Sequence, residues 1–235
     1  MFHKSRLQRV IVPLVALAAI LAFACSRAEA QVKPFKIRGA GPAPQGISLV
    51  PLTPAPHSAV GEATMLGRYQ GAGMFQILRF TGPLTAEFSS APDFVFTAAN
   101  GDKLAVTYGV VANGAAQPGQ VTLTPNADGS FTAVFVAEFN PEPAKCTGRF
   151  ANITGGSWIM VAVSDPFFIT GTSTTPFNYR WEGQGQLVFG DAARRRAVQA
   201  QSRAQSLALQ QAIIARLRSS LSPVSRQTVK VARPK

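Results

Sequence analysis

The feature that most constrains the fold of this 235-residue chain is the alternation of large apolar residues with other residues between positions 61 and 190. In residues 131–139 every odd position is apolar, in the order Phe131, Ala133, Phe135, Ala137 and Phe139. In residues 179–189 the odd positions hold aromatic residues, glycines and leucine. A period of two is typical of a β-strand with one face in a core. The pattern therefore predicts strands in this part of the chain.

The number and spacing of these segments predict a sheet of many short strands. Nine or so segments are separated by Gly, Pro and hairpin dipeptides such as Asn100-Gly101 and Asp128-Gly129. Gly183 and Gly185 would weaken a strand unless it bends sharply or packs closely against something, which favours a closing strand. We therefore predict an all-β fold, a closed antiparallel β-barrel of about eight strands over residues 61–190. A β-sandwich is the alternative.

Residues 1–30 have the layout of a secretory signal peptide. Basic residues precede an apolar run from 10 to 24, and Ala28-Glu29-Ala30 provides the small residues of a cleavage site. The run has about 15 residues, whereas a helix that spans a membrane needs about 20. We therefore predict cleavage after Ala30 and a secreted or periplasmic protein.

Cys25 leaves a second interpretation of the same segment open. It follows the apolar run as the acceptor cysteine of a bacterial lipoprotein would, although Ala22 stands where such sites usually carry Leu. Lipidation of Cys25 is the alternative to cleavage after Ala30.

Residues 31–60 are rich in proline and contain few large apolar residues. Six prolines fall between positions 31 and 59. Because proline removes a backbone donor and favours extended chain, this composition predicts a Pro-rich linker that does not pair.

The net charge of +12 is concentrated at the C-terminal end. Residues 31–190 hold nine basic and nine acidic residues, while residues 191–235 hold ten basic and one acidic. Residues 192–221 lack Gly and Pro and carry an apolar stripe of Leu207, Ile214, Leu217 and Leu221. This predicts a basic amphipathic helix over residues 191–222 and a disordered tail over 223–235.

A basic amphipathic helix on an exported protein suits an anionic envelope polymer or a membrane surface, or it packs back on its own domain. Nucleic acid is not expected as a partner, because no aromatic residues interleave with the arginines.

Residues that could perform catalysis or bind metal are scarce. After the leader the chain has one histidine, His57, which lies in the Pro-rich run, and one cysteine, Cys146. An internal disulfide is therefore impossible, and Cys146 is either a buried small residue or pairs between chains in a homo-oligomer. Without a histidine in the domain, a nucleophile lacks its usual base. We expect no cofactor, no metal and no catalysis.

Two segments carry a resemblance. Residues 98–104 read Ala-Ala-Asn-Gly-Asp-Lys-Leu, and residues 146–156 contain Thr-Gly-Arg-Phe followed by Thr-Gly. Together they resemble uncharacterised secreted bacterial proteins that are similar to the small β-barrels of the allene oxide cyclase and dirigent type. The resemblance covers about residues 61–189 and implies a barrel without implying an activity. Cys146 stands where the pattern usually has glycine.

These turns also supply the candidate ligand-binding residues. Asp102 can bond nearby backbone N–H groups, and Arg149 can pair with a carboxylate across the barrel mouth, which is a structural role. A ligand role for Asp102 or Arg149 is the alternative. Arg180 and Glu182 lie two apart on one strand face. They are either a solvated outer pair or, if that face points inward, a buried polar pair that orients a substrate.

The function that these observations favour is that of an exported, non-catalytic, envelope-associated or extracellular protein that binds a partner or has a structural role. The alternative is a barrel that binds, or less readily isomerises, a small apolar molecule. The chain has sixteen phenylalanines, two of them in the predicted leader, and the others can fill the interior of a small barrel or line a cavity in it.

Overall fold

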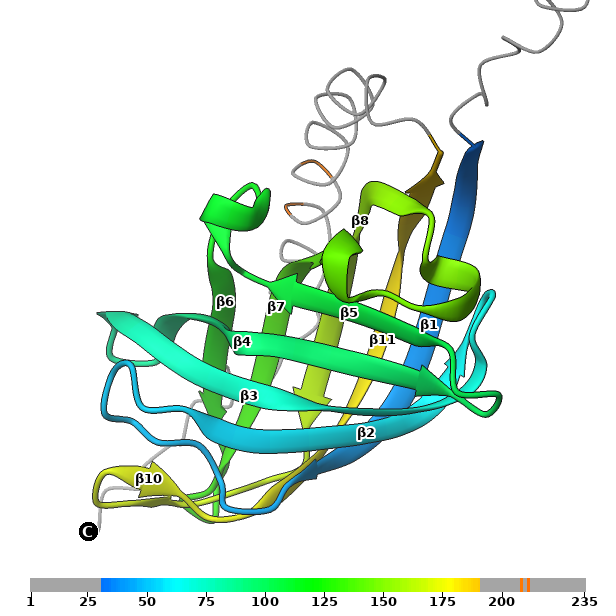
Figure 1. Ribbon diagram of the computed structural model, residues 1–235. Helices are drawn as coiled ribbons and strands as arrows, with labels where there is room; N and C mark the ends of the chain where they lie inside the picture. Colours follow the sequence, from blue (N-terminus) through cyan, green and yellow to red (C-terminus); the bar gives the residue numbers. More distant parts are fainter. Residues whose placement is uncertain (1–30, 191–207, 209–210, 212–235) are drawn as a thin grey trace, which may run out of the picture.

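The structure, a computed structural model, describes residues 31–190 and the isolated positions 208 and 211 (Figure 1). The strands are β1 (Gln31–Ala43), β2 (Ala55–Ala63), β3 (Gly67–Gly82), β4 (Thr85–Ala98), β5 (Lys103–Tyr108), β6 (Gly119–Pro125), β7 (Phe131–Pro141), β8 (Ile153–Ser164), β9 (Ile169–Thr170), β10 (Ser173–Thr174) and β11 (Phe177–Phe189). Three 3-10 turns connect some of them: η1 (Val111–Asn113), η2 (Pro143–Lys145) and η3 (Gly148–Phe150).

Eight of the strands form a closed ring of antiparallel pairings. The order around the ring is β3-β2-β1-β11-β8-β7-β5-β4, and β4 pairs with β3 again. β6 pairs with both β4 and β7 and thereby occupies the same gap as the short strand β5. The predictions of an all-β fold and of a single antiparallel sheet with about eight strands around it are confirmed.

The predicted linker over residues 31–60 is wrong, because this segment contains β1 and most of β2. β1 pairs with β11 along its whole length, from Gln31 opposite Phe189 to Ala43 opposite Phe177. Phe35, inside the supposed linker, is fully buried.

The positions of the prolines explain how β1 forms despite them. The N–H of Lys36 donates to Thr64 Oγ1 at 3.0 Å, so even-numbered residues of β1 direct their backbone groups away from β11. Pro34 and Pro42 are also even-numbered, so they too face away from β11. β2, on that side, pairs with β1 only across Ile37–Ala40. The N–H groups that these prolines lack therefore fall where the ladder needs no donor.

Predicted turns and close approaches also appear in the structure. Asn100-Gly101 turns the chain from β4 to β5, with Gly101 at φ +87°, and the Asn100 side chain accepts from the N–H of Asp102. Gly185 lies against β8, because a Cβ atom on it would lie 2.2 Å from the carbonyl oxygen of Ser157. The close packing expected around the glycines of this strand is therefore present.

Both ends of the ring are covered. At one end η2 and η3 bring the fully buried Phe150 over the interior. At the other end the segment after β1 joins the β9–β10 hairpin, since Ile47 and Thr174 exchange two hydrogen bonds of 2.9 and 3.0 Å. Figure 1 shows these covers above and below the ring.

The remaining predicted segments fall outside the described residues. They are the signal peptide over residues 1–30 with Cys25, the basic helix over 191–222 apart from positions 208 and 211, and the tail over 223–235. Each remains a prediction. Within the described part of the chain, no helix has the length and apolar character needed to cross a membrane.

Candidate functional site

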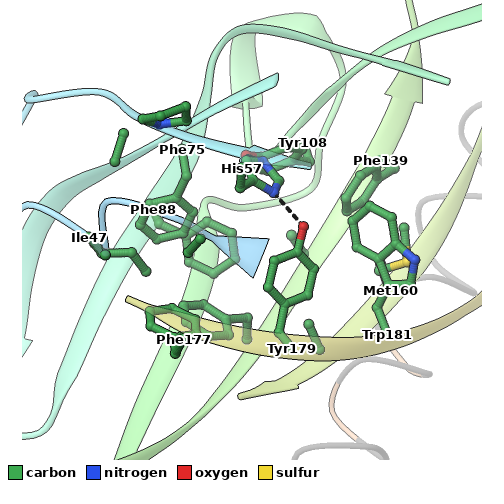
Figure 2. A pocket seen from close by; sticks show the side chains of 17 residues that line it. Ile47, His57, Phe75, Phe88, Tyr108, Phe139, Met160, Phe177, Tyr179 and Trp181 are labelled. Carbon is green, nitrogen blue, oxygen red and sulfur yellow. Dashed lines mark hydrogen bonds between the residues drawn. The ribbon is translucent and has the colours of Figure 1, made fainter. Parts of the chain in front are cut away.

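An apolar cavity lies inside the ring, at the end that the β9–β10 hairpin covers. It encloses about 560 Å³ of space free of atoms, part of it open to solvent, and about 60 Å³ of this can hold the centres of water-sized molecules. Figure 2 shows the side chains around it. The principal lining residues are Ile47, Ala55, His57, Phe75, Phe88, Tyr108, Phe135, Ala137, Phe139, Met160, Ala162, Phe177, Tyr179 and Trp181.

Alternating large and small residues create this cavity. On β7 the inward-facing residues are Phe135, Ala137 and Phe139, and the two rings stand apart across the small alanine. On β8 Ala162 lies opposite Phe135, and Met160 lies opposite Ala137. A space therefore remains where two short side chains face the interior.

The aromatic walls hold one another in place. The rings of Phe75 and Phe88 stack with centroids 4.9 Å apart, and Phe135 meets each of them edge-on at 5.7 Å. Phe139 packs against Tyr108 at 4.8 Å. Offset and edge-to-face pairs of this kind stabilise a fixed arrangement of rings. The cavity is therefore preformed by the packing of its walls.

A hydrogen-bonded chain of three polar side chains crosses one wall. His57 on β2 has Nδ1 2.8 Å from the hydroxyl of Tyr179 and Nε2 2.8 Å from the hydroxyl of Tyr108. Figure 2 shows the imidazole directed at the Tyr179 hydroxyl. Each hydroxyl also lies next to a backbone carbonyl: Tyr179 is 2.8 Å from that of Ser58, and Tyr108 is 3.0 Å from that of Met74.

Burial determines the protonation state of this chain. It lowers the pKa of His57 from 6.5 to about 4, because a charged imidazolium would lose its hydration among these rings. Burial also raises the pKa of the Tyr108 and Tyr179 hydroxyls above the usual range. All three groups are therefore neutral at neutral pH.

A neutral imidazole has one N–H and one bare nitrogen. It donates a hydrogen bond to one tyrosine hydroxyl, which in turn donates to a backbone carbonyl, and it accepts a hydrogen bond from the other tyrosine. The polar atoms of His57, Tyr108 and Tyr179 are thus occupied by one another and by the backbone. These three residues therefore expose mainly carbon atoms to the cavity.

The hydrogen-bond donor of Trp181 also has a partner outside the cavity. Its indole Nε1–H donates to the hydroxyl of Tyr69 at 2.8 Å, and this hydroxyl donates to the carbonyl of Arg38 at 3.0 Å. The ring of Trp181 is left to form an apolar wall of the cavity.

The side chains around the cavity provide few groups for proton transfer. No carboxylate is among the residues that line the cavity, and His57 is a weak base with both nitrogens engaged. In the described part of the chain, no three His, Cys, Asp or Glu side chains lie close enough to hold a metal ion.

The structure brings Asp102 and Arg149 together, at the opposite end of the ring. Arg149 Nε donates to Asp102 Oδ2 at 2.7 Å, and its guanidinium also donates to the carbonyl of Met65. The hydrogen bond and charge of Arg149 lower the pKa of Asp102. This ion pair ties the turn after β4 to η3, which matches the structural role predicted for Arg149. Neither residue lines the cavity.

Arg180 and Glu182 lie on the outer face of β11 and are exposed. The inward alternative for this pair is therefore wrong, because the intervening Trp181 is the residue that points into the ring. Beside them on the outside, Arg38 and Glu62 form an exposed ion pair of 3.1 Å.

Cys146 is a buried free cysteine, with Sγ 3.5 Å from the carbonyl oxygen of Ala105. Burial raises the pKa of its thiol. Cys146 therefore lies in the structure as a buried small residue, which is one of the two roles considered for it from the sequence.

Sequence reasoning missed His57, Tyr108 and Tyr179. The prolines around His57 concealed a weak period of two, in which Ala55, His57 and Ala59 occupy alternate positions. That period was the available signal that β2 faces the interior with His57.

Comparisons with protein-family models, with curated proteins and with solved structures find no match to this chain. The cavity and the residues around it are therefore the features from which a function can be inferred.

Proposed function

We propose that this protein is an exported, non-catalytic β-barrel that binds one small apolar molecule inside its ring of strands. The observation that carries the proposal is a preformed aromatic cavity whose polar side chains are all engaged in hydrogen bonds away from the ligand space. Export is taken from the signal-peptide layout of residues 1–30.

The chemistry of the walls limits the ligand. Pockets for drug-sized molecules commonly have volumes of about 300–1,000 Å³. The 560 Å³ at this site includes open solvent, and only about 60 Å³ can hold the centres of water-sized molecules, so the ligand must be small. A ligand with a charged group would lose hydration and gain no partner, whereas apolar surface gains about 25 cal/mol for each Å² removed from water. The proposed class is therefore a small, uncharged hydrocarbon of about the size of one aromatic ring.

The same geometry disfavours the isomerisation considered from the sequence. A general acid or base must reach the reacting atom, and its pKa must suit the working pH. His57 has a pKa near 4 and both ring nitrogens bonded to tyrosines. We therefore place binding before catalysis.

A small apolar quencher tests the proposal. Iodobenzene is a small, uncharged and apolar probe, and its binding can be followed by quenching of the fluorescence of Trp181, which lines the cavity. We expect saturable binding of one probe per chain. In Ala162→Leu the added side chain fills the ligand space, so the dissociation constant should rise at least tenfold.

The matched control is Ala72→Leu, the same substitution on the exposed outer face of β3. It should bind the probe as the unaltered protein does, and circular dichroism should show the same β spectrum for all three proteins. Absence of saturable binding, or equal affinity in Ala162→Leu, would overturn the proposal.

A further inference from the structure

The outer face of β7 and β8 carries an apolar surface that the interior does not use. Five residues, here called the outer patch, point away from the ring: Val134, Val136, Ile159, Val161 and Val163. They alternate along their strands with inward-facing residues such as Phe135 and Met160. Direct pairing of Val134 with Val163 and of Val136 with Val161 makes the patch continuous across the two strands.

Three residues of the outer patch are buried and two are partly buried, although all five lie on the outside of the ring. Val134, Val136 and Ile159 have exposed fractions of 8, 3 and 2 %. Val60, on the outer face of β2, is 61 % exposed, and Arg180 on the neighbouring strand β11 is also exposed. Burial on the outer face is therefore uneven, and it includes the polar Glu138 and Asn140 as well as the apolar centre of the outer patch. The apolar centre needs a segment that covers it.

We infer that residues 191–222 of the same chain form an amphipathic helix that docks on the outer patch. The apolar stripe predicted for this segment, Leu207, Ile214, Leu217 and Leu221, matches a narrow apolar surface flanked by polar residues. Such a stripe of side chains from one helix face is the usual partner of a sheet face that must be covered.

The distances agree with this docking. β11 ends at Phe189, which lies opposite Ile153 at the start of β8. Ile159 to Val163 lie six to ten residues further along β8, or about 20–35 Å at 3.3 Å per residue. In a helix that starts at Asp191, Leu207 to Leu221 lie about 24–45 Å from the start at 1.5 Å per residue. A helix that runs back along β8 thus places its stripe over the patch.

The leader also leaves the ring at this end, because Gln31 pairs with Phe189. Its run from 10 to 24 is apolar on all sides, so docking on a patch of five residues would leave most of its surface in water. Residues 191–222 direct one apolar stripe at the patch and keep their arginines in solvent. The basic segment is therefore the occupant that fits.

Limited trypsin digestion of the full chain tests this inference, because the segment contains cleavable Arg203, Arg216 and Arg218. In the unaltered protein cleavage at Arg216 should be slow. The double variant Val161→Asp and Val163→Asp places two charges in the outer patch and should accelerate this cleavage at least tenfold. The matched control Val60→Asp changes an outer residue away from the patch and should leave the rate unchanged.

A second variant keeps the ring unaltered in case the patch substitutions impair folding. Ile214→Asp with Leu217→Asp should release the segment, accelerate its cleavage and increase binding of an anilinonaphthalene dye to the uncovered patch. Ala212→Asp, on the opposite side of the predicted helix, should change neither quantity.

Three results would overturn the inference. One is rapid cleavage at Arg216 in the unaltered protein. Another is protection that appears only with vesicles of anionic phospholipid, which would assign the segment to a membrane. The third is a dimer in native mass spectrometry that the patch variant converts to a monomer, with the cleavage rate unchanged, which would assign the patch to a second copy of the chain.

Discussion

At the scale of single residues, His57 decides the character of the cavity. Its ring lies between the hydroxyls of Tyr108 and Tyr179 at 2.8 Å from each, and desolvation keeps it neutral. A histidine beside a substrate is often a base, but this one holds two tyrosines so that their polar ends point away from the ligand space. Sequence analysis identified His57 but could not show that it contacts Tyr108 and Tyr179, which lie 51 and 122 residues further along the chain.

The depressed pKa of His57 makes stability depend on pH. The folded protein binds a proton near pH 4, while the unfolded chain binds it near pH 6.5. Below pH 6.5 the unfolded state therefore gains protons first, and the free energy of unfolding should fall by about 3 kcal/mol from this group as the pH drops from 6.5 to 4. Denaturant unfolding at several pH values measures this loss.

The variant His57→Gln removes the titrating group and serves as the control. The carboxylates titrate in both proteins, so the difference in unfolding free energy between them isolates His57. A difference that stays constant between pH 6.5 and 4 would contradict the buried, neutral imidazole.

At the scale of elements, the strands that sequence analysis found differ in composition from β1 and most of β2, which it assigned to a linker. β7 and β11 alternate large apolar residues with others, and this period survives in the structure. β1 carries glycines and prolines, so its local composition favours unpaired chain. Its pairing with β11 and β2 provides the compensating ladder, and that information lies about 150 residues away along the sequence.

The side to which each residue of β1 directs its backbone N–H predicts where the strand tolerates a new proline. Val32→Pro repeats the parity of Pro34 and lies outside the stretch that pairs with β2, so the midpoint of thermal unfolding should change little. Ala40→Pro has the same parity but lies opposite Val60 of β2, where it removes a ladder donor. It should lower the free energy of unfolding by about 1–3 kcal/mol. Equal tolerance of both variants would contradict the assigned ladder.

At the scale of the whole molecule, the all-β fold class followed from alternation and turn residues, whereas the membership of β1 and β2 in the ring and the cavity did not. Phe and Ala at alternate positions of β7 indicated that one face of this strand points inward. Whether the Phe rings fill the interior of the ring or leave a cavity depends on how the eight strands are arranged. The space beside Ala137 and Ala162 exists because these two alanines face the same region of the ring. The proximity of the two alanines arises only when the strands assemble into the ring.

A titration of the protein with toluene, followed by the NMR signals of methyl groups, tests whether the interior of the ring binds small apolar molecules. We expect saturable shifts of the methyl signals of Met160, Ala137 and Ala162, one toluene per chain, with little change at the exposed Ala72. Shifts confined to surface methyl groups, or none at Met160 at saturating toluene, would contradict an interior that binds small apolar molecules.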